Sequence, residues 1–478
     1  MEKHIKDTIY RFIFMIIMAI ISFNLTGCAS ISPPAFLSPS PSSESAAGSP
    51  ATLTPPANSS EVWQGNTATI WNSLQQASAA KLKTMQSNLD DPVKRAWIQL
   101  ALINKRNSTN TPQLVRELLA WREQNPNHPA NQLLPDNSTL DRLLTMPPPS
   151  KIAVLLPLQG SYGSSGQAVR EGFLNAYYKN MSKVGKQTVK FYDTSTTQDI
   201  AALHQHAMLE GADFVVGPLT KSNVQQLSQT GPFTYPILAL NYTDTRSLPA
   251  NFYEYGLLPE DEVTQVADRA RQRGLSRAII IAPQSAWGNR LVTAFSNRWQ
   301  AAGGKIQQTW YYTKQTNFNA EIAGLLNVNP NADKDLMKTN NDKTVLEQQR
   351  RQDFDVIFLF AQPQEARTIV PLLRYYYANN VPIYATSAVQ SSTHANNDVD
   401  LNGVTVCDIP NAGGGNDGMS SNRLYAVGQD AYLLSQALER LIMLPNFSIY
   451  GTTGALTLSP SHQIHRRLPC TTIQNGAM

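Results

Sequence analysis

Cysteine is scarce in this sequence, with only three among 478 residues. Cys407 and Cys470 have no second cysteine or histidine at the spacing that a metal site or an activated nucleophile needs. We therefore expect neither a zinc site nor a catalytic thiol. Two interpretations of this pair stay open: two free, buried thiols, or a disulfide in an oxidising compartment such as the periplasm.

A large charge of one sign is lacking as well. The formal net charge is +4 at pH 7, which is near neutral for a chain of this length. No face shows the density of lysine and arginine that binding to nucleic acid requires. The sequence therefore predicts no nucleic-acid partner.

Long apolar runs are confined to the N-terminal segment. Residues 12–21 are all apolar and follow the basic residues Lys3, Lys6 and Arg11. Because this run is too short for a permanent membrane-spanning helix, it predicts a signal peptide over residues 1–27.

The predicted signal peptide ends in Leu25-Thr26-Gly27-Cys28, which resembles the lipobox of bacterial lipoproteins. The resemblance implies cleavage before Cys28, whose thiol and amine then carry acyl chains. Each buried methylene contributes about 0.8 kcal/mol, so such an anchor is firm. Ala29 stands where an aspartate would favour retention in the inner membrane, so we expect a lipid anchor in the outer membrane, facing the periplasm.

Sequence signatures of common enzymes are missing, since there is neither a G-x-S-x-G nor an H-E-x-x-H motif. Two acidic clusters, Asp90-Asp91 and Glu260-Asp261-Glu262, open predicted helices, where capping and the helix dipole account for them. We therefore expect no catalytic residue and no enzymatic activity.

The histidine pairs predict no metal site. His204 and His206 lie two residues apart on a predicted helix and so face different ways. His462 and His465 stand next to Arg466, whose charge would repel a cation. We expect a surface role for His462 and His465, and no bound metal.

The segment 151–173 holds Gly160, Gly163 and Gly166 at steps of three. Loops that bind dinucleotides or phosphates need G-x-G-x-x-G or G-x-x-x-x-G-K-[ST] instead. Since no lysine and no ribose-binding acid is suitably placed, we expect no nucleotide and no other cofactor.

Composition divides the rest of the chain into three parts. Residues 28–60 hold the predicted lipid site and a tether rich in proline and serine, which cannot bury enough apolar area to fold. Residues 61–146 show helical periodicity and paired helices of tetratricopeptide type. A stiff run of three prolines then leads into residues 147–478, where strands and helices alternate.

The part from residue 147 onward predicts an α/β fold. Its candidate strands are near-continuous apolar runs, which are typical of parallel strands buried on both faces. The length exceeds that of one ordinary sheet, so we expect two lobes. Lobe 1 is predicted at about 151–257 and 382–430, and lobe 2 at about 258–381 and 431–478. The candidate strands are 151–157, 188–193, 213–218, 236–241, 277–283, 306–312, 355–361 and 381–387.

Open α/β sheets bind ligands outside the carboxyl ends of their strands. The polar residues that follow the predicted strands carry hydroxyls, amides and aromatic rings, without a lysine or a carboxylate. Such a set suits binding better than acid–base catalysis. The predicted cleft-lining residues are Gln159, Ser161, Tyr162, Thr220, Asn241, Ser285, Trp287 and Thr386.

The segment PLQG at residues 157–160, with Gly166 and Gly172 in the following predicted helix, forms a sequence pattern. This pattern resembles that of proteins with the type I periplasmic-binding-protein fold. Two further segments narrow the resemblance to the LppC/LpoA family: DFVVGPLTKSNV (213–224) and GTTGALTLSPSHQIHRRLPCTTIQNG (451–476). Residues 91–130 also resemble the helical domain of that family. The implied fold class is a two-lobed α/β domain of that type, preceded by a small all-α, tetratricopeptide-like domain.

The resemblance also implies a function. Members of this family are non-enzymatic lipoproteins of the outer membrane. They reach through the peptidoglycan mesh, bind a class A penicillin-binding protein, which is an inner-membrane synthase of peptidoglycan, and activate it. Two alternatives stay open. One is a lipid-anchored periplasmic receptor for a small amino-acid-like solute, and the other is an enzyme of the cell wall.

Overall fold

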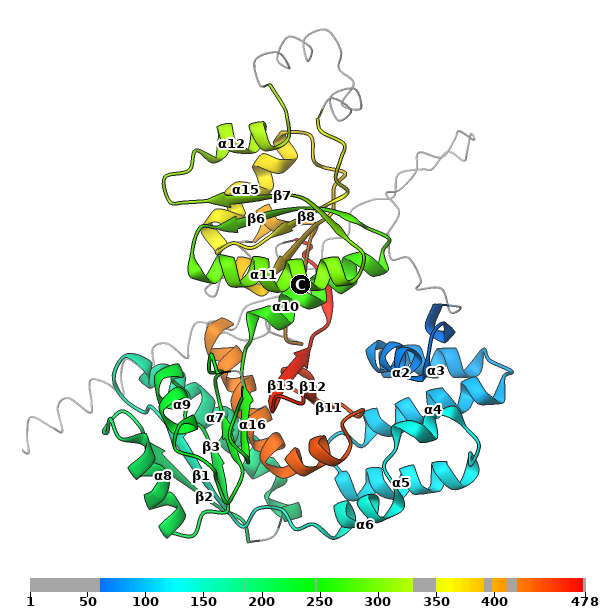
Figure 1. Ribbon diagram of the computed structural model, residues 1–478, viewed down its shortest axis with the longest axis vertical. Coiled ribbons are helices and arrows are strands. Elements are labelled where there is room, and N and C mark those ends of the chain that lie inside the picture. Colours follow the sequence, from blue (N-terminus) through cyan, green and yellow to red (C-terminus); the bar gives the residue numbers. More distant parts are fainter. Residues whose placement is uncertain are drawn as a thin grey trace, which may run out of the picture. The chain divides into compact units, whose positions relative to one another are not determined.

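The computed structural model of this chain describes residues 61–184, 186–245, 247–329, 350–390, 398–410 and 419–475 (Figure 1). The predicted signal peptide, Cys28 and the tether lie outside the described residues. Within the described ranges, no helix is both long and apolar enough to cross a membrane.

The N-terminal helical region is built around three tryptophans. Its elements are α2 (Thr67–Gln76), α3 (Ala79–Ser87), α4 (Pro92–Arg106), α5 (Thr111–Gln124) and α6 (Asn137–Thr145), with 3-10 turns at Glu61–Trp63 and Pro129–Leu133. Trp71, Trp97 and Trp121 are buried, and the ring of His128 packs edge-on against Trp97 and Trp121. Asp91 accepts hydrogen bonds from two backbone amides at the start of α4, which confirms capping for this carboxylate.

Lobe 1 is built around an eight-stranded sheet. Its elements are β1 (Lys151–Leu156), a 3-10 turn (Gly160–Tyr162), α7 (Gly163–Val184), β2 (Thr188–Asp193), α8 (Ile200–Leu209), β3 (Phe214–Val216), α9 (Lys221–Ser228), β4 (Ile237–Ala239), β5 (Phe252–Tyr255), α16 (Met419–Met443), β11 (Ile449–Gly451), β12 (Gly454–Leu458) and β13 (Gln463–Arg467). The strand order is β11-β12-β13-β5-β4-β3-β1-β2, parallel from β13 to β2 and antiparallel from β11 to β13.

Both faces of the first sheet are covered by helices. Ile152 and Val154 of β1 share a core with α7 and α16, whereas Ala153 and Leu155 face α8 and α9. This two-sided burial explains why β1 reads as a continuous apolar run instead of an alternating one.

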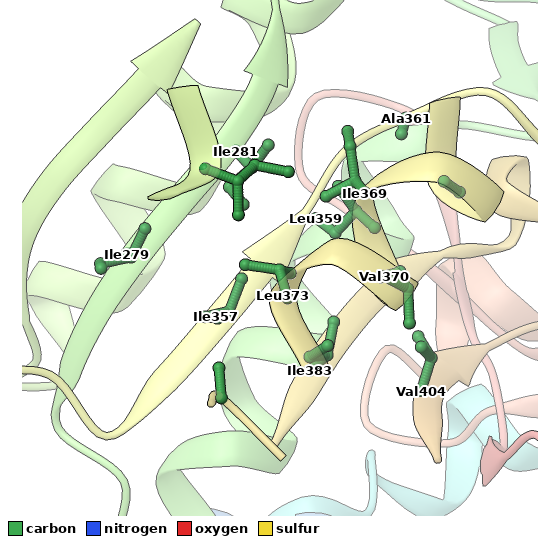
Figure 2. Packing of buried hydrophobic residues seen from close by; sticks show 14 of the residues in the cluster. Ile279, Ile281, Ile357, Leu359, Ala361, Ile369, Val370, Leu373, Ile383 and Val404 are labelled. Atoms are coloured by element: carbon green, nitrogen blue, oxygen red, sulfur yellow. The ribbon is translucent and has the colours of Figure 1, made fainter. Parts of the chain in front are cut away.

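Lobe 2 is built around a six-stranded sheet with the order β14-β10-β9-β8-β6-β7. Its elements are α10 (Pro259–Gln272), β6 (Arg277–Pro283), α11 (Ala286–Ala301), β7 (Lys305–Tyr312), α12 (Phe318–Leu325), β8 (Val356–Leu359), α15 (Pro363–Tyr375), β9 (Ile383–Thr386), β10 (Val404–Cys407) and β14 (Cys470–Thr472), with 3-10 turns at Ser387–Val389 and Val399–Leu401. Figure 2 shows one of its cores, where Ile279 and Ile281 of β6 meet Ile369 and Leu373 of α15. The opposite face packs against α10 and α11.

The predicted lobe boundaries differ from the observed sheet membership. Strand β9 pairs with β8 (Ile357 opposite Ile383) and with β10, so these two strands belong to lobe 2 and not to lobe 1. Conversely, all of α16 and β11–β13 belong to lobe 1, and only β14 returns to lobe 2. The physical reason is that an apolar run predicts a buried strand but carries no local signal for which of two sheets it joins.

Helix α16 also joins lobe 1 to the helical region. Arg440 is 1 % exposed, and its Nη1 donates hydrogen bonds to the backbone carbonyls of Asn107 (3.0 Å) and Ser108 (2.8 Å). Its Nη2 donates to Oδ1 of Asn104 at 2.8 Å. Phe447, just after α16, lies in the tryptophan cluster of the helical region. We call this set of contacts the α16 junction.

Candidate functional site

The chain passes between the two sheets three times, after β5, after β10 and after β13. A cavity of about 190 Å³ lies beside these passages, next to the carboxyl ends of β9 and β10. We call it the crossover cavity and treat it as the candidate functional site. Its lining residues are Leu257, Pro259, Glu262, Trp287, Gln362, Thr386, Ser387, Ala388, Asp408, Ile409, Arg423 and Arg466.

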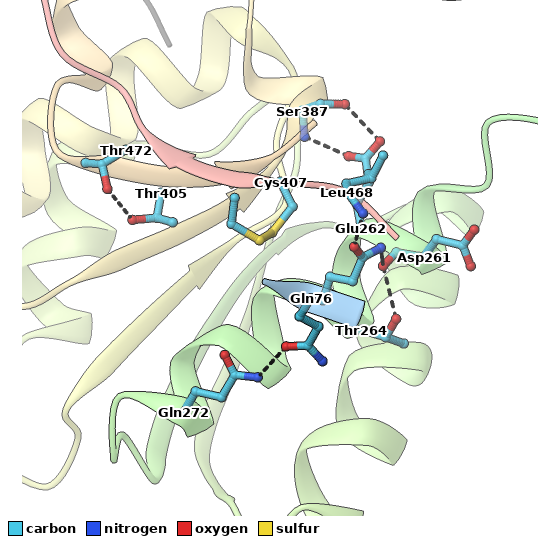
Figure 3. Close-up of a disulfide and its surroundings, with 12 residues drawn as sticks. Gln76, Asp261, Glu262, Thr264, Gln272, Ser387, Thr405, Cys407, Leu468 and Thr472 are labelled. Atoms are coloured by element: carbon cyan, nitrogen blue, oxygen red, sulfur yellow. Dashed lines mark hydrogen bonds between the residues drawn. A yellow bond between two sulfur atoms is a disulfide. The ribbon is translucent and has the colours of Figure 1, made fainter. Parts of the chain in front are cut away.

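Glu262 lies in the first turn of α10 and is buried. Its carboxylate accepts hydrogen bonds from the backbone amide (2.8 Å) and the hydroxyl (3.0 Å) of Ser387, which follows β9 (Figure 3). Burial raises the pKa of Glu262, and the charge of Arg466 opposes this shift. This carboxylate therefore ties α10 to the end of β9 on one wall of the cavity.

Capping and the helix dipole at the start of α10 therefore do not fully account for the three carboxylates of residues 260–262. Asp261 accepts hydrogen bonds from the backbone amide of Arg466 (2.9 Å) and from the ring of His465 (2.8 Å), both on β13. Glu260 forms an ion pair with Arg290 of α11 at 2.8 Å. All three carboxylates lie at the start of α10, but each one also binds another segment.

Asp408 is the second carboxylate of the cavity and follows β10 directly. It is 3 % exposed, and it forms an ion pair with Arg423 of α16 and accepts a hydrogen bond from the backbone amide of Ile409 at 2.7 Å. The ion pair links a strand end of lobe 2 to a helix of lobe 1. The residues predicted to line a cleft include no carboxylate, whereas Glu262 and Asp408 both line the crossover cavity.

Arg466 and Thr386 carry hydrogen-bonding groups that have no partner among the described residues. Arg466 is 3 % exposed, and neither its Nε nor its Nη2 has a hydrogen-bond acceptor in that part of the chain. The carboxylate of Glu262 lies 3.9 Å from Nη2, which is beyond hydrogen-bond distance. The hydroxyl of Thr386, at the end of β9, is also buried without a partner.

A disulfide lies next to the cavity. Cys407 and Cys470 are bonded and face each other in the antiparallel pair of β10 and β14 (Figure 3). The bridge fastens the returning strand β14 to the strand that ends at Asp408. The structure therefore contains the disulfide, which is one of the two interpretations that the sequence left open.

The structure brings two of the eight predicted cleft residues, Trp287 and Thr386, to the cavity. The other six lie elsewhere, and most of them serve local structure. The side-chain amide of Gln159 donates to Asp193, and that of Asn241 donates to the carbonyl of Leu219. Thr220 contacts Ser222, and Ser285 caps α11 by accepting a hydrogen bond from the amide of Gly288. Ser161 and Tyr162 are exposed.

The predicted set came from strand ends that belong to two different sheets, and two of its residues line the crossover cavity. Sequence reasoning missed the charged residues Glu262, Asp408, Arg423 and Arg466. Asp408 carried a usable signal, since it follows an apolar run that ends a strand. Nothing local distinguishes Arg423 or Arg466 from a surface arginine.

The histidines take part in pairwise contacts. His465 pairs with Asp261, which raises the pKa of His465, while His462 stacks on the ring of Tyr253 and His206 contacts Glu210. Among the described residues, no group of three or more histidine, cysteine or acidic side chains is placed to hold a metal ion.

Comparison with known proteins gives consistent matches in sequence. The family model described as "LppC putative lipoprotein" matches residues 52–476 of this chain. The penicillin-binding protein activator LpoA of Vibrio cholerae serotype O1 is 31 % identical over 423 residues, which cover 84 % of this chain and 69 % of that protein.

Solved structures confirm the predicted fold class. The C-domain of LpoA from Haemophilus influenzae, a regulator of PBP1A, matches 69 % of this chain and 98 % of its own, with a TM-score of 0.57 and 26 % identity. A protein assigned to branched-chain amino acid ABC transport in Chromobacterium violaceum matches 68 % of this chain and 99 % of its own, with a TM-score of 0.53 and 24 % identity. The second likeness concerns the fold alone and places the two lobes among type I periplasmic-binding-protein-like folds.

Proposed function

Because the chain belongs to the LppC lipoprotein family, we propose that it binds a class A penicillin-binding protein, activates it and so regulates peptidoglycan synthesis. The observation that carries this proposal is the 31 % identity to a penicillin-binding protein activator over 84 % of the chain. The family match at residues 52–476 includes the helical region as well as both lobes, so the likeness extends beyond the common binding-protein fold.

The proposed location follows from the N-terminal segment. A lipid on Cys28 would hold the chain in the outer membrane, whereas class A synthases are anchored in the inner membrane. A tether of 30 residues spans about 90 Å as an extended polyproline helix. The folded body could therefore stand away from its anchor, cross the peptidoglycan mesh and meet the synthase.

We propose a non-enzymatic mechanism, in which the activator favours the active conformation of the synthase. Such an effect requires contacts that are present in the active conformation and absent in the inactive one. Anchoring in the facing membrane adds local concentration. The α16 junction supports this mechanism, because it holds the helical region on lobe 1 through Arg440, so both can contribute to one contact surface.

A receptor for a small solute is a second candidate function. The crossover cavity and the likeness to a solute-binding fold favour it. The two functions are compatible, since a solute that binds one conformation of the activator would change its affinity for the synthase.

The direct test adds the full chain, purified in detergent, to a purified class A synthase from the same organism. We expect a saturable, severalfold rise in the rates of glycan polymerisation and crosslinking, together with a complex that sediments as one species. Unchanged rates combined with the absence of a complex would overturn the proposal.

Two controls separate activation from its alternatives. Heat-unfolded chain in the same detergent should leave the synthase rate unchanged. The chain alone, incubated with purified peptidoglycan, should release no soluble fragments; released fragments would favour an enzyme of the cell wall.

A further inference from the structure

We propose that the disulfide between Cys407 and Cys470 is a redox-sensitive lock on the hinge between the two lobes. In the oxidised chain the bridge holds the lobes in one relative arrangement, and its reduction by a dithiol allows them to move. This proposal does not rest on the activation of a synthase, because it is argued from the three passages between the lobes alone.

The first argument is the position of the two cysteines. Cys407 is the last residue of β10, where the second passage begins, and Cys470 is the first residue of β14, where the third passage ends. A hinge motion of two lobes needs backbone rotations in the segments that connect them. The bridge therefore joins two of the three hinge segments covalently.

The second argument is the short length of the third passage. Only Leu468 and Pro469 stand between β13 and β14, and proline fixes its own φ. The backbone amide of Asp408, in the second passage, donates a hydrogen bond to the carbonyl of Pro469 at 3.2 Å. The second and third passages thus lie side by side at the bridge, and neither can rotate independently while the bridge is intact.

The third argument is that the first passage is fastened to the third by noncovalent bonds. The first passage leads into α10, where Asp261 accepts a hydrogen bond from the amide of Arg466 at 2.9 Å. Gln265 of α10 donates to the carbonyl of Arg466 at 2.9 Å and accepts from the amide of Leu468. Hydrogen bonds of this kind contribute little net free energy each and can break and form again. The bridge differs from them, because a covalent bond does not open in thermal motion.

The fourth argument is how β14 is held without the bridge. This strand has three residues, lies at the edge of its sheet and forms three residue pairs with β10, and Ile473 beyond it is buried. A short edge strand opens more readily than the central strands of a sheet. Once the bridge is reduced, the end of the third passage can therefore separate from the start of the second.

The reduction is a thiol–disulfide exchange. One thiolate of the dithiol attacks a sulfur of the bridge, the S–S bond breaks, and the second thiol of the reductant resolves the mixed disulfide. Two electrons and two protons pass to the chain, which then carries two thiols, while the dithiol becomes a disulfide. Cys407 is completely buried and Cys470 is partly exposed, so we expect the exchange to begin at Cys470.

Single-molecule energy transfer in the full chain, purified in detergent, measures the relative arrangement of the lobes. Two dyes are attached through azide-bearing amino acids that replace Leu209 of α8 and Tyr375 of α15, whose side chains are 87 % and 61 % exposed. We expect one narrow population in the oxidised chain and a broader or second population after reduction with dithiothreitol. The double variant Cys407→Ala/Cys470→Ala should match the reduced chain, and dithiothreitol should not change it further.

Hydrogen exchange of backbone amides locates the change. The amides of Asp408 and Leu468 are hydrogen-bonded in the oxidised chain, and both should exchange at least about tenfold faster in the double variant. Leu118→Ala is the matched control, because it leaves a cavity in the core of the helical region and destabilises the chain without touching a passage. This control should change both exchange rates by less than about twofold.

Three results would overturn the proposal. The first is the same distribution of energy transfer in the oxidised chain and the double variant. The second is an equal acceleration of the two amides in the double variant and in Leu118→Ala, which would show that the bridge adds only overall stability. The third is a bridge that dithiothreitol reduces only after the chain has unfolded, which would exclude a redox switch.

The reduced unchanged chain supplies the same measurements if the double variant fails to fold. Two additional thiols per chain, counted after reduction, establish that the bridge has opened. No synthase is present in these experiments, so their failure is distinguishable from a failure of the proposed activation.

Discussion

Two buried arginines of this chain differ in what surrounds them. Arg440, at the α16 junction, is 1 % exposed and donates hydrogen bonds to two backbone carbonyls and to an asparagine side chain of the helical region, with only its Nε left over. Arg466, at the crossover cavity, is 3 % exposed, yet its Nε and Nη2 both lack an acceptor among the residues that the structure describes.

The difference separates a buried charge with several hydrogen-bond acceptors from a buried charge with few. A buried ion repays its desolvation only through well-placed partners. Arg440 has such acceptors in the helical region and so fixes that region on lobe 1. Arg466 has fewer acceptors, and it lies beside a cavity large enough for a small molecule. The following predictions test this contrast.

The largest effect is expected at Arg440. Its replacement in Arg440→Met removes a donor from the carbonyl of Ser108 and from Oδ1 of Asn104, and one of two donors from the carbonyl of Asn107, so the free energy of unfolding should fall by about 3–5 kcal/mol. Urea unfolding of the full chain, followed by tryptophan fluorescence, measures this loss. The exposed arginine variant Arg298→Met should lose less than about 1 kcal/mol. Equal losses in the two variants would contradict an architectural role for Arg440.

The disulfide gives the next effect. Cys407 and Cys470 close a loop with a sequence separation of 63 residues, and such a bridge typically contributes about 2–4 kcal/mol. The double variant Cys407→Ala/Cys470→Ala should therefore unfold at lower urea concentration. Reduced unchanged chain should match the double variant, and addition of reductant should not alter the variant further. A variant as stable as the oxidised chain would show that the bridge contributes nothing.

A smaller, pH-dependent effect is expected at His465. Its hydrogen bond with Asp261 raises its pKa in the folded chain above the ordinary value. The resulting stabilisation is fully present below the pKa of the unfolded state, about 6.5, and is lost as the pH rises through the folded-state pKa. His465→Gln should thus cost more stability at pH 5.5 than at pH 8.5. Solvent reaches 37 % of the side chain, so screening keeps the difference below about 1 kcal/mol.

The control for this pH effect is His206→Gln, which removes a more exposed histidine that contacts Glu210. Paired unfolding curves at the two pH values should show a larger change for His465→Gln than for His206→Gln. A cost that is the same at both pH values for His465→Gln would mean that its contact with Asp261 does not depend on protonation.

The smallest effect is expected at Thr386. Because its hydroxyl has no partner, Thr386→Val should change the free energy of unfolding by less than about 0.5 kcal/mol, or raise it. Thermal and urea unfolding measure this change. A loss above about 1 kcal/mol would reveal a hydrogen-bond partner for Thr386 within the chain.

The sequence predicted β1, β3, β4, β6, β8 and β9, in which burial on both faces leaves an apolar run. It missed β10, although Val404, Val406 and Cys407 are buried there, as well as β11–β14. It also missed β5, because Glu254 interrupts the run. Glu254 is completely buried and accepts hydrogen bonds from the amide of Thr243 and from the side chain of Gln463. Gln463 lies 209 residues away in sequence, so no local pattern reveals that this charge belongs inside.

The candidate site shows the same limit. Trp287 and Thr386 could be predicted, since they follow strands of one sheet. Arg423 and Arg466 reach the cavity from α16 and β13, whose positions depend on how the chain passes between the lobes. The disulfide likewise depends on β14 returning beside β10, and the spacing of Cys407 and Cys470 carries no sign of that return.

Activation of a peptidoglycan synthase is measured by the initial rate of glycan polymerisation by a class A synthase as the full chain is titrated in. We expect this rate to rise severalfold and to reach a plateau at a fixed ratio of the two proteins. A rate that stays flat over the whole titration, with no complex formed at the highest concentration, would contradict it.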